Sequence, residues 1–210
     1  MRYASEVGCK VIFVNYRLAP KNPHPVFFED CYSAMCWAYD NADTLGIDTS
    51  RIGIGGDSAG STLSVGVIMM AKDRAHPISF AFQMLPYPFL DARNNSEACK
   101  KYTDTPMWNS KLSERIAPMT RVDRSRPDHI YYSPVEAENF AGFPPAYIET
   151  AEFDCLHDDG ILYAKKLRDD GVDVVLNETL GTMHGFDIVQ RAKITKSALA
   201  ARVKFMKERF

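Results

Sequence analysis

The chain of 210 residues lacks several features that mark specialised classes of protein. No apolar run approaches the ~20 residues that span a bilayer, and the N-terminal segment MRYASEVGCK lacks the apolar core of a signal peptide. Its 5 cysteines form no CxxC pair, and the odd count argues against a disulfide framework. A net charge of −2 without a block of like charges gives no sign of a nucleic-acid surface. These absences predict a cytoplasmic protein with reduced thiols, no membrane span, no nucleic-acid partner and a small-molecule partner.

What is present indicates one globular α/β domain over residues 1–210. At 46% hydrophobic and 25% charged residues, the chain is long enough for one large core. No repeat interrupts it, and short β-rich runs alternate with longer helical patterns, as in a parallel sheet covered by helices. We expect strands at 10–18, 51–56, 79–90, 146–153 and 173–179, and helices at 28–42, 59–72, 158–170 and at the C-terminus.

The pattern weakens between residues 91 and about 145. The run WNSKLSERIAPMT predicts a short helix there, and RSRPDHIYYSP reads as a loop. An irregular segment of this length is typical of a cap over a site. Aromatic candidates for an acyl pocket are Tyr87, Phe89, Trp108 and Tyr131, although each taken alone is more typical of a core.

The stretch GIGGDSAGST contains a G-x-S-x-G element between a predicted strand and a predicted helix. A serine at such a turn has a strained backbone, and flanking glycines leave room for neighbouring elements. The hydroxyl of Ser58 would then project beside a helix N-terminus, whose free N–H groups favour negative charge. We therefore predict that Ser58 is a nucleophile rather than part of a plain glycine turn.

A serine nucleophile needs a base and a carboxylate that orients the base, in the chain order Ser, Asp or Glu, His. His184 follows the last predicted strand, in a loop flanked by glycines, and is the candidate base. The other histidines fall in predicted loops, and His157 has no second histidine at the spacing of a metal site, so no metal is expected.

Asp154 ends the strand AYIETAEF and is the preferred carboxylate. Strand alternation puts Glu152 and Asp154 on the same side, so periodicity does not separate them. Asp158 and Asp159 are further rivals, although they are typical of the first turn of a helix.

Several segments together resemble the hormone-sensitive-lipase-like branch of the α/β-hydrolases. They are NYRLAPKNPHP, FEDCYSAMCWAYDNADTLGID, RIGIGGDSAGS, SPVEAENFAGFPPAYIETAEFDCLHDDG and MHGF. The resemblance implies an α/β-hydrolase fold and hydrolysis of carboxylic esters of small acyl groups, without a cofactor. It assigns Ser58 as nucleophile, His184 as general acid and base, and Asp154, favoured over Glu152, as the residue that orients His184.

One departure from that family concerns the oxyanion hole. The family carries an HGGG element upstream of YRLAP, and this sequence has none, so about a third of the usual fold is expected to be absent at the N-terminus. The Ala59 N–H remains as an oxyanion donor, and each lost donor lowers kcat by about 10²–10³. A non-catalytic ligand-binding protein or an inactive fragment is therefore the alternative.

The same departure predicts an exposed sheet edge. We expect either a homo-oligomer whose chains complete each other or a closed sheet in which the strand at 10–18 pairs with the strand at 51–56.

Overall fold

The computed structural model describes residues 2–210, in which the strands build a parallel sheet. The strands are β1 (Gly53–Gly55), β2 (Phe82–Pro86), β3 (Ala146–Phe153) and β4 (Val174–Met183). Within the described residues these four strands run in the order β1-β2-β3-β4, and each neighbouring pair is parallel. The register places Ile54 beside Gln83, Met84 beside Tyr147, and Ile148 beside Leu176. The α/β class predicted from the sequence is confirmed.

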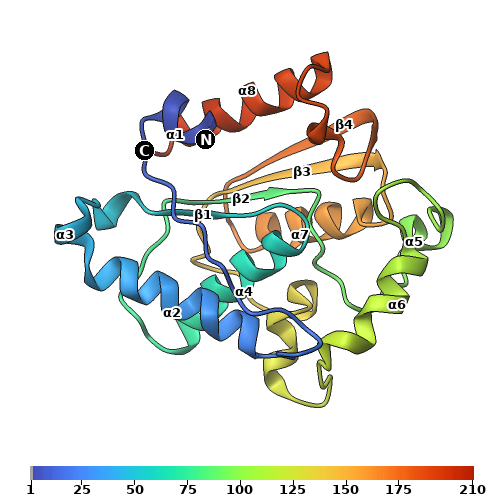
Figure 1. The fold of residues 1–210 in the computed structure, drawn as a ribbon, viewed down its shortest axis with the longest axis horizontal. Helices are drawn as coiled ribbons and strands as arrows, with labels where there is room; N and C mark the ends of the chain where they lie inside the picture. Colours follow the sequence, from blue (N-terminus) through green and yellow to red (C-terminus); the bar gives the residue numbers. More distant parts are fainter. Residues whose placement is uncertain (1) are drawn as a thin grey trace.

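Helices cover both faces of the sheet. They are α1 (Arg2–Val7), α2 (Val26–Asp40), α3 (Ala42–Leu45), α4 (Ala59–Asp73), α5 (Glu97–Lys101), α6 (Ser110–Thr120), α7 (His157–Asp169) and α8 (Lys193–Lys207). Figure 1 shows α1 and α8 on one face, and α2, α4 and α7 on the other. Short 3-10 helices occur at Thr49–Arg51, Pro127–Tyr131, Pro134–Glu136 and Phe186–Ile188. No helix within residues 2–210 is long and apolar enough to cross a membrane.

The central strands are buried because helices lie on both of their faces. All five residues of β2 are buried, and so are the first six of β3. One core lies between the sheet and α4 with α7, and includes Leu85, Ile148 and Leu167. The core on the opposite face joins Phe82 and Tyr147 to Phe205 and Met206 of α8.

The segment predicted as the first strand, residues 10–18, forms no strand in the structure. Several of its apolar side chains stay in solvent, with Val11, Ile12 and Phe13 exposed by 45%, 49% and 85%, whereas Val14 and Tyr16 pack against the core. β-propensity cannot hold a strand without a partner ladder, and no ladder joins this segment to β1 within residues 2–210. The expected closed sheet is therefore wrong, and the expected homo-oligomer stays a prediction.

The segment from residue 91 to about 145 is more regular than the sequence suggests. The helix expected near Trp108 is present as α6, and its N-cap Asn109 accepts a hydrogen bond from the Leu112 N–H. A further helix, α5, begins after the cap Ser96, and the expected loop RSRPDHIYYSP contains the 3-10 helix Pro127–Tyr131. In Figure 1, α5 and α6 lie beyond the carboxyl ends of β2 and β3.

Candidate active site

Ser58 lies at the sharp turn between β1 and α4. Its φ of 55° and ψ of −117° are unusual for a residue with a side chain, and such a conformation persists only where the surroundings enforce it. The Ser58 N–H donates to the Pro86 carbonyl at the end of β2, at 3.0 Å. This bond fastens the turn to the carboxyl end of the neighbouring strand.

The two glycines around Ser58 have different surroundings. A Cβ on Gly56 would lie 2.8 Å from the carbonyl carbon and oxygen of Gly60, closer than backbone atoms can tolerate. A Cβ on Gly60 would meet nothing within 4 Å. The turn therefore requires glycine at position 56, because the backbone of Gly60 fills that space.

His184 directly follows β4 and reaches Ser58. Its Nε2 lies 2.9 Å from the Ser58 Oγ, and the residue is 8% exposed. The next residue, Gly185, has a φ of 66°, which turns the chain back under the histidine. The Tyr87 ring packs edge-on against the imidazole, with centroids 4.9 Å apart.

Asp154 follows β3 and is completely buried. Its Oδ2 lies 2.6 Å from the His184 Nδ1, and its Oδ1 accepts the Leu156 N–H at 3.0 Å. A carboxylate only accepts hydrogen bonds, so the proton of the neutral imidazole is on Nδ1. The His184 Nε2 is therefore the acceptor that faces the Ser58 hydroxyl.

The rival carboxylates have other partners. Glu152 accepts the Gly181 N–H at 2.7 Å, and Asp158 accepts the Ala98 N–H at 2.9 Å. Asp159 is buried and accepts the N–H groups of Leu90 and Asp91, each at 3.0 Å. The carboxylate that the structure brings to His184 is that of Asp154, and the other three brace nearby backbone.

Two further side chains that follow Asp154 in the chain, the Cys155 thiol and the His157 imidazole, lie in different surroundings from those of His184. Burial raises the pKa of the Cys155 thiol well above its usual range, which disfavours the reactive thiolate. The His157 ring lies between Asp158 and Glu178, at 3.1 and 3.5 Å. Within residues 2–210 no group of three or more metal-binding side chains is found.

A cavity of about 730 Å³ opens onto Ser58 and is lined mainly by apolar side chains. Phe89 and Trp108 line it, as the sequence suggested, whereas Tyr87 packs against His184 and Tyr131 donates to Asp73. Its wall also includes residues that the sequence did not single out, among them Tyr16, Phe27, Phe28, Leu63, Ile116 and Tyr132. They come from segments distant in sequence, and they share only their position around the cavity.

The Ala59 N–H is the first amide of α4 and adjoins both Ser58 and the cavity. Among the described residues no acceptor is found for it, whereas the next amide, Gly60 N–H, donates to the Asp57 carbonyl at 2.8 Å. A free amide at a helix N-terminus is a donor suited to a negatively charged oxygen.

Residues 1–188 match a protein family described as alpha/beta hydrolase fold. The chain belongs to this family. The resemblance noted from its sequence motifs is thereby confirmed. The chain of this α/β-hydrolase is 35% identical over 181 residues to esterase LipI of Mycobacterium tuberculosis, covering 84% of this chain and 55% of the relative. It is 35% identical over 188 residues to carboxylesterase NlhH of the same species, covering 87% and 59%.

Solved structures agree with this placement of the α/β-hydrolase. A bacterial heroin esterase superposes with a TM-score of 0.88 at 34% identity, over 92% of this chain and 62% of that structure. Esterase LipW from Mycobacterium marinum superposes with a TM-score of 0.93 at 28% identity, over 99% and 65%. The chain thus spans only 55–59% of the length of the two curated relatives.

Proposed function

We propose that this α/β-hydrolase cleaves carboxylic esters of small acyl groups through an acyl-enzyme intermediate. The observation that carries the proposal is the line of hydrogen bonds from Ser58 Oγ to His184 Nε2, at 2.9 Å, and from His184 Nδ1 to Asp154, at 2.6 Å. In this order the imidazole accepts the serine proton and the carboxylate stabilises the imidazolium, so the serine hydroxyl becomes a nucleophile. The relatives named as esterases support the same reaction class.

In the first half-reaction, the Ser58 Oγ attacks the acyl carbon while its proton passes to His184 Nε2. Asp154 stabilises the resulting imidazolium and holds the ring in place. The carbonyl oxygen becomes negatively charged, and the Ala59 N–H donates to it. When the intermediate collapses, the alcohol leaves with the proton from His184, and the acyl group remains on Ser58.

In the second half-reaction, water loses a proton to His184 Nε2 and attacks the acyl-enzyme. The carboxylic acid leaves, and the proton returns to Ser58. No step requires a cofactor or a metal ion. The apolar cavity supplies space for uncharged acyl and alcohol groups, and its volume lies in the ordinary range for small-molecule sites.

We also propose that residues 91–145 form a cap over this cavity. Helix α6 contributes Ser113, Ile116, Ala117 and Pro118 to the lining of the same cavity that Ser58 lines. The segment is tied to α7 by Asp158, which accepts the Ala98 N–H of α5.

A fluorophosphonate probe tests the proposed nucleophile. Wild type should be labelled, and Ser58→Ala should not. Ser64→Ala is the matched control: it removes a serine hydroxyl from the same helix, one bonded to the Gly60 carbonyl, and should leave labelling intact. Hydrolysis of p-nitrophenyl acetate faster than p-nitrophenyl octanoate would support a small acyl group. Absence of labelling in folded wild type would overturn the proposal and favour a binding protein or an inactive fragment.

A further inference from the structure

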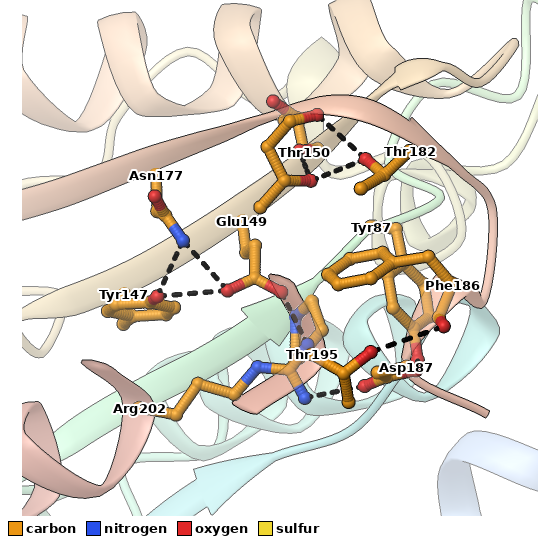
Figure 2. A network of polar contacts seen from close by, with 12 residues as sticks. Tyr87, Tyr147, Glu149, Thr150, Asn177, Thr182, Phe186, Asp187, Thr195 and Arg202 are labelled. Atoms are coloured by element: carbon orange, nitrogen blue, oxygen red, sulfur yellow. Dashed lines mark hydrogen bonds and ion pairs between the residues drawn. The ribbon is translucent and has the colours of Figure 1, made fainter. Parts of the chain in front are cut away.

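A buried network of charged and polar side chains joins β3 and α8 to the loop that follows His184 (Figure 2). At its centre, Arg202 of α8 is 1% exposed and donates to Glu149 of β3 and, at 2.7 Å, to Asp187. The second oxygen of Glu149 accepts the Tyr147 hydroxyl at 2.9 Å and the Asn177 amide at 3.0 Å. These bonds satisfy both oxygens of a carboxylate that would otherwise be costly to bury.

Asp187 connects this network to the loop that carries His184. It lies three residues after the histidine, in the 3-10 helix Phe186–Ile188. Its Oδ2 accepts from Arg202, and its Oδ1 accepts the Tyr87 hydroxyl at 2.8 Å. With both oxygens engaged and only 14% of the side chain exposed, Asp187 fixes the loop to α8 and to the segment after β2.

Tyr87 then reaches the imidazole itself. Its ring is 5% exposed and meets the His184 ring edge-on, at 4.9 Å and 63°. Its backbone has a φ of 35° and is held by an N–H bond to the Glu149 carbonyl. The preceding residue, Pro86, accepts the Ser58 N–H. One short segment thus contacts the serine turn, the histidine ring and the histidine loop.

We propose that Tyr87 and Asp187, anchored by Arg202, are positioning residues that hold the His184 imidazole in the orientation that faces Ser58. Asp154 holds one ring nitrogen but does not by itself set the tilt of the ring plane, against which Tyr87 packs edge-on at 4.9 Å and Trp108 lies at 6.2 Å. The edge-on Tyr87 ring restricts this tilt, and the bond to Asp187 restricts Tyr87 in turn. The inference rests on the proposed function, in which His184 accepts the serine proton.

The test compares Tyr87→Phe and Asp187→Asn with wild type. Tyr87→Phe keeps the ring but removes the donor to Asp187, and Asp187→Asn removes the charge that pairs with Arg202. We expect each variant to be labelled about tenfold more slowly by the fluorophosphonate, since small displacements of catalytic groups lower rates strongly. The double variant should be no slower than the slower single variant, because both changes break the same connection.

A second readout does not depend on turnover. The proton on His184 Nδ1 should give a downfield NMR signal, which should broaden or disappear in both variants because the ring moves. This signal separates the hydrolase function from the positioning role. If wild type shows the NMR signal but is not labelled by the fluorophosphonate, the hydrolase function is contradicted, and the positioning role is still tested by the signal of the two variants.

Tyr163→Phe is the matched control, because Tyr163 is also buried and its hydroxyl donates to Gln83, near the opposite end of β2. It should keep the labelling rate and the NMR signal of wild type. Tyr87→Phe and Asp187→Asn variants that match this control in both readouts, while folded by circular dichroism, would overturn the positioning role. So would additive effects in the double variant.

Discussion

The two sides of Ser58 differ in how firmly they are built. On the side of β3 and β4, Glu149 and Asp154 are completely buried, and Arg202 is nearly so. On the side of β1, the strand is three residues long, and the segment at 10–18 leaves Phe13 85% exposed. The side proposed to transfer protons is therefore held by packed neighbours, whereas the side proposed to stabilise an oxyanion offers the Ala59 N–H.

Two of the three residues of the candidate triad are held by the side of β3 and β4, whereas Ser58 lies at the turn after β1. His184 and Asp154 take their positions from β3, β4 and α8, which pack on one another. Ser58 is fastened to β2, the strand that pairs with β3, by its bond to Pro86. Changes on the two sides should consequently have very different effects.

The largest expected effect is on the proton-transfer side. His184→Ala removes the base next to Ser58 and should lower ester turnover by about 10²–10⁴-fold. His157→Ala is the control, because that ring is engaged with Asp158 and Glu178 and not with Ser58. Initial rates with a p-nitrophenyl ester measure both. Equal losses in the two variants would contradict the role of His184.

The second prediction concerns buried charge. Glu149→Leu leaves the Arg202 guanidinium without one of its two buried carboxylates and should lower the free energy of unfolding by about 3–5 kcal/mol. Asp30→Asn breaks the pair with Arg17, an arginine side chain that is 62% exposed, and should change stability little. Urea unfolding measures both. Similar losses of unfolding free energy in Glu149→Leu and Asp30→Asn would contradict the difference in packing between the two sides.

The third prediction is a pH dependence. Burial raises the pKa of Asp159 well above its usual range, although the Leu90 and Asp91 N–H groups oppose this shift. Because the folded state binds this proton more tightly, the stability it contributes is complete below the unfolded pKa of about 4 and is lost as pH rises through the folded pKa. Asp159→Asn should therefore gain stability relative to wild type as pH rises above 4.

Unfolding midpoints in urea at several pH values check this prediction. Asp123→Asn is a control of opposite sign, because hydrogen bonds from Ser125 lower the pKa of this exposed carboxyl. Its difference from wild type should shrink as pH falls. A stability difference for Asp159→Asn that stays constant with pH would contradict the predicted shift.

The smallest expected effect separates the two glycines at the turn. Gly56→Ala puts a methyl group 2.8 Å from the Gly60 backbone and should lower the free energy of unfolding by about 1–3 kcal/mol. Gly60→Ala points into open space and should stabilise α4 by up to about 1 kcal/mol, because glycine is a weak helix former. Thermal unfolding compares the two variants. A Gly60→Ala variant less stable than Gly56→Ala would contradict the open space found around Gly60.

Local sequence could predict the turn at Ser58 because its glycine spacing is contiguous. It also placed most of the strands and helices, since their apolar periodicity is local. Strand alternation could not separate Asp154 from Glu152, because it assumes a regular strand; the position of Asp154 at the strand end and the family resemblance favoured Asp154. In the structure the pairing of β3 with β4 shifts between Ala151 and Phe153, after which Glu152 bonds to Gly181 and Asp154 to His184.

The remaining features depend on contacts between distant residues. The strand predicted at 10–18 had the right composition, but a strand requires a partner, which composition does not reveal. The connection of Tyr87 to Asp187 and Arg202 likewise has no sequence motif. Such residues are recognisable only once β2, α8 and the loop after β4 are brought together.

The backbone of Ser58 has one last consequence. A residue with a side chain at a φ of 55° and ψ of −117° raises the free energy of the folded chain by about 1–3 kcal/mol, which glycine at this position would largely recover. Ser58→Gly should thus yield a protein that is more stable to unfolding and has no nucleophile. At this position the nucleophilic hydroxyl and a higher free energy of unfolding exclude each other. Variants selected only for thermal stability are therefore expected to replace Ser58 and lose the hydroxyl.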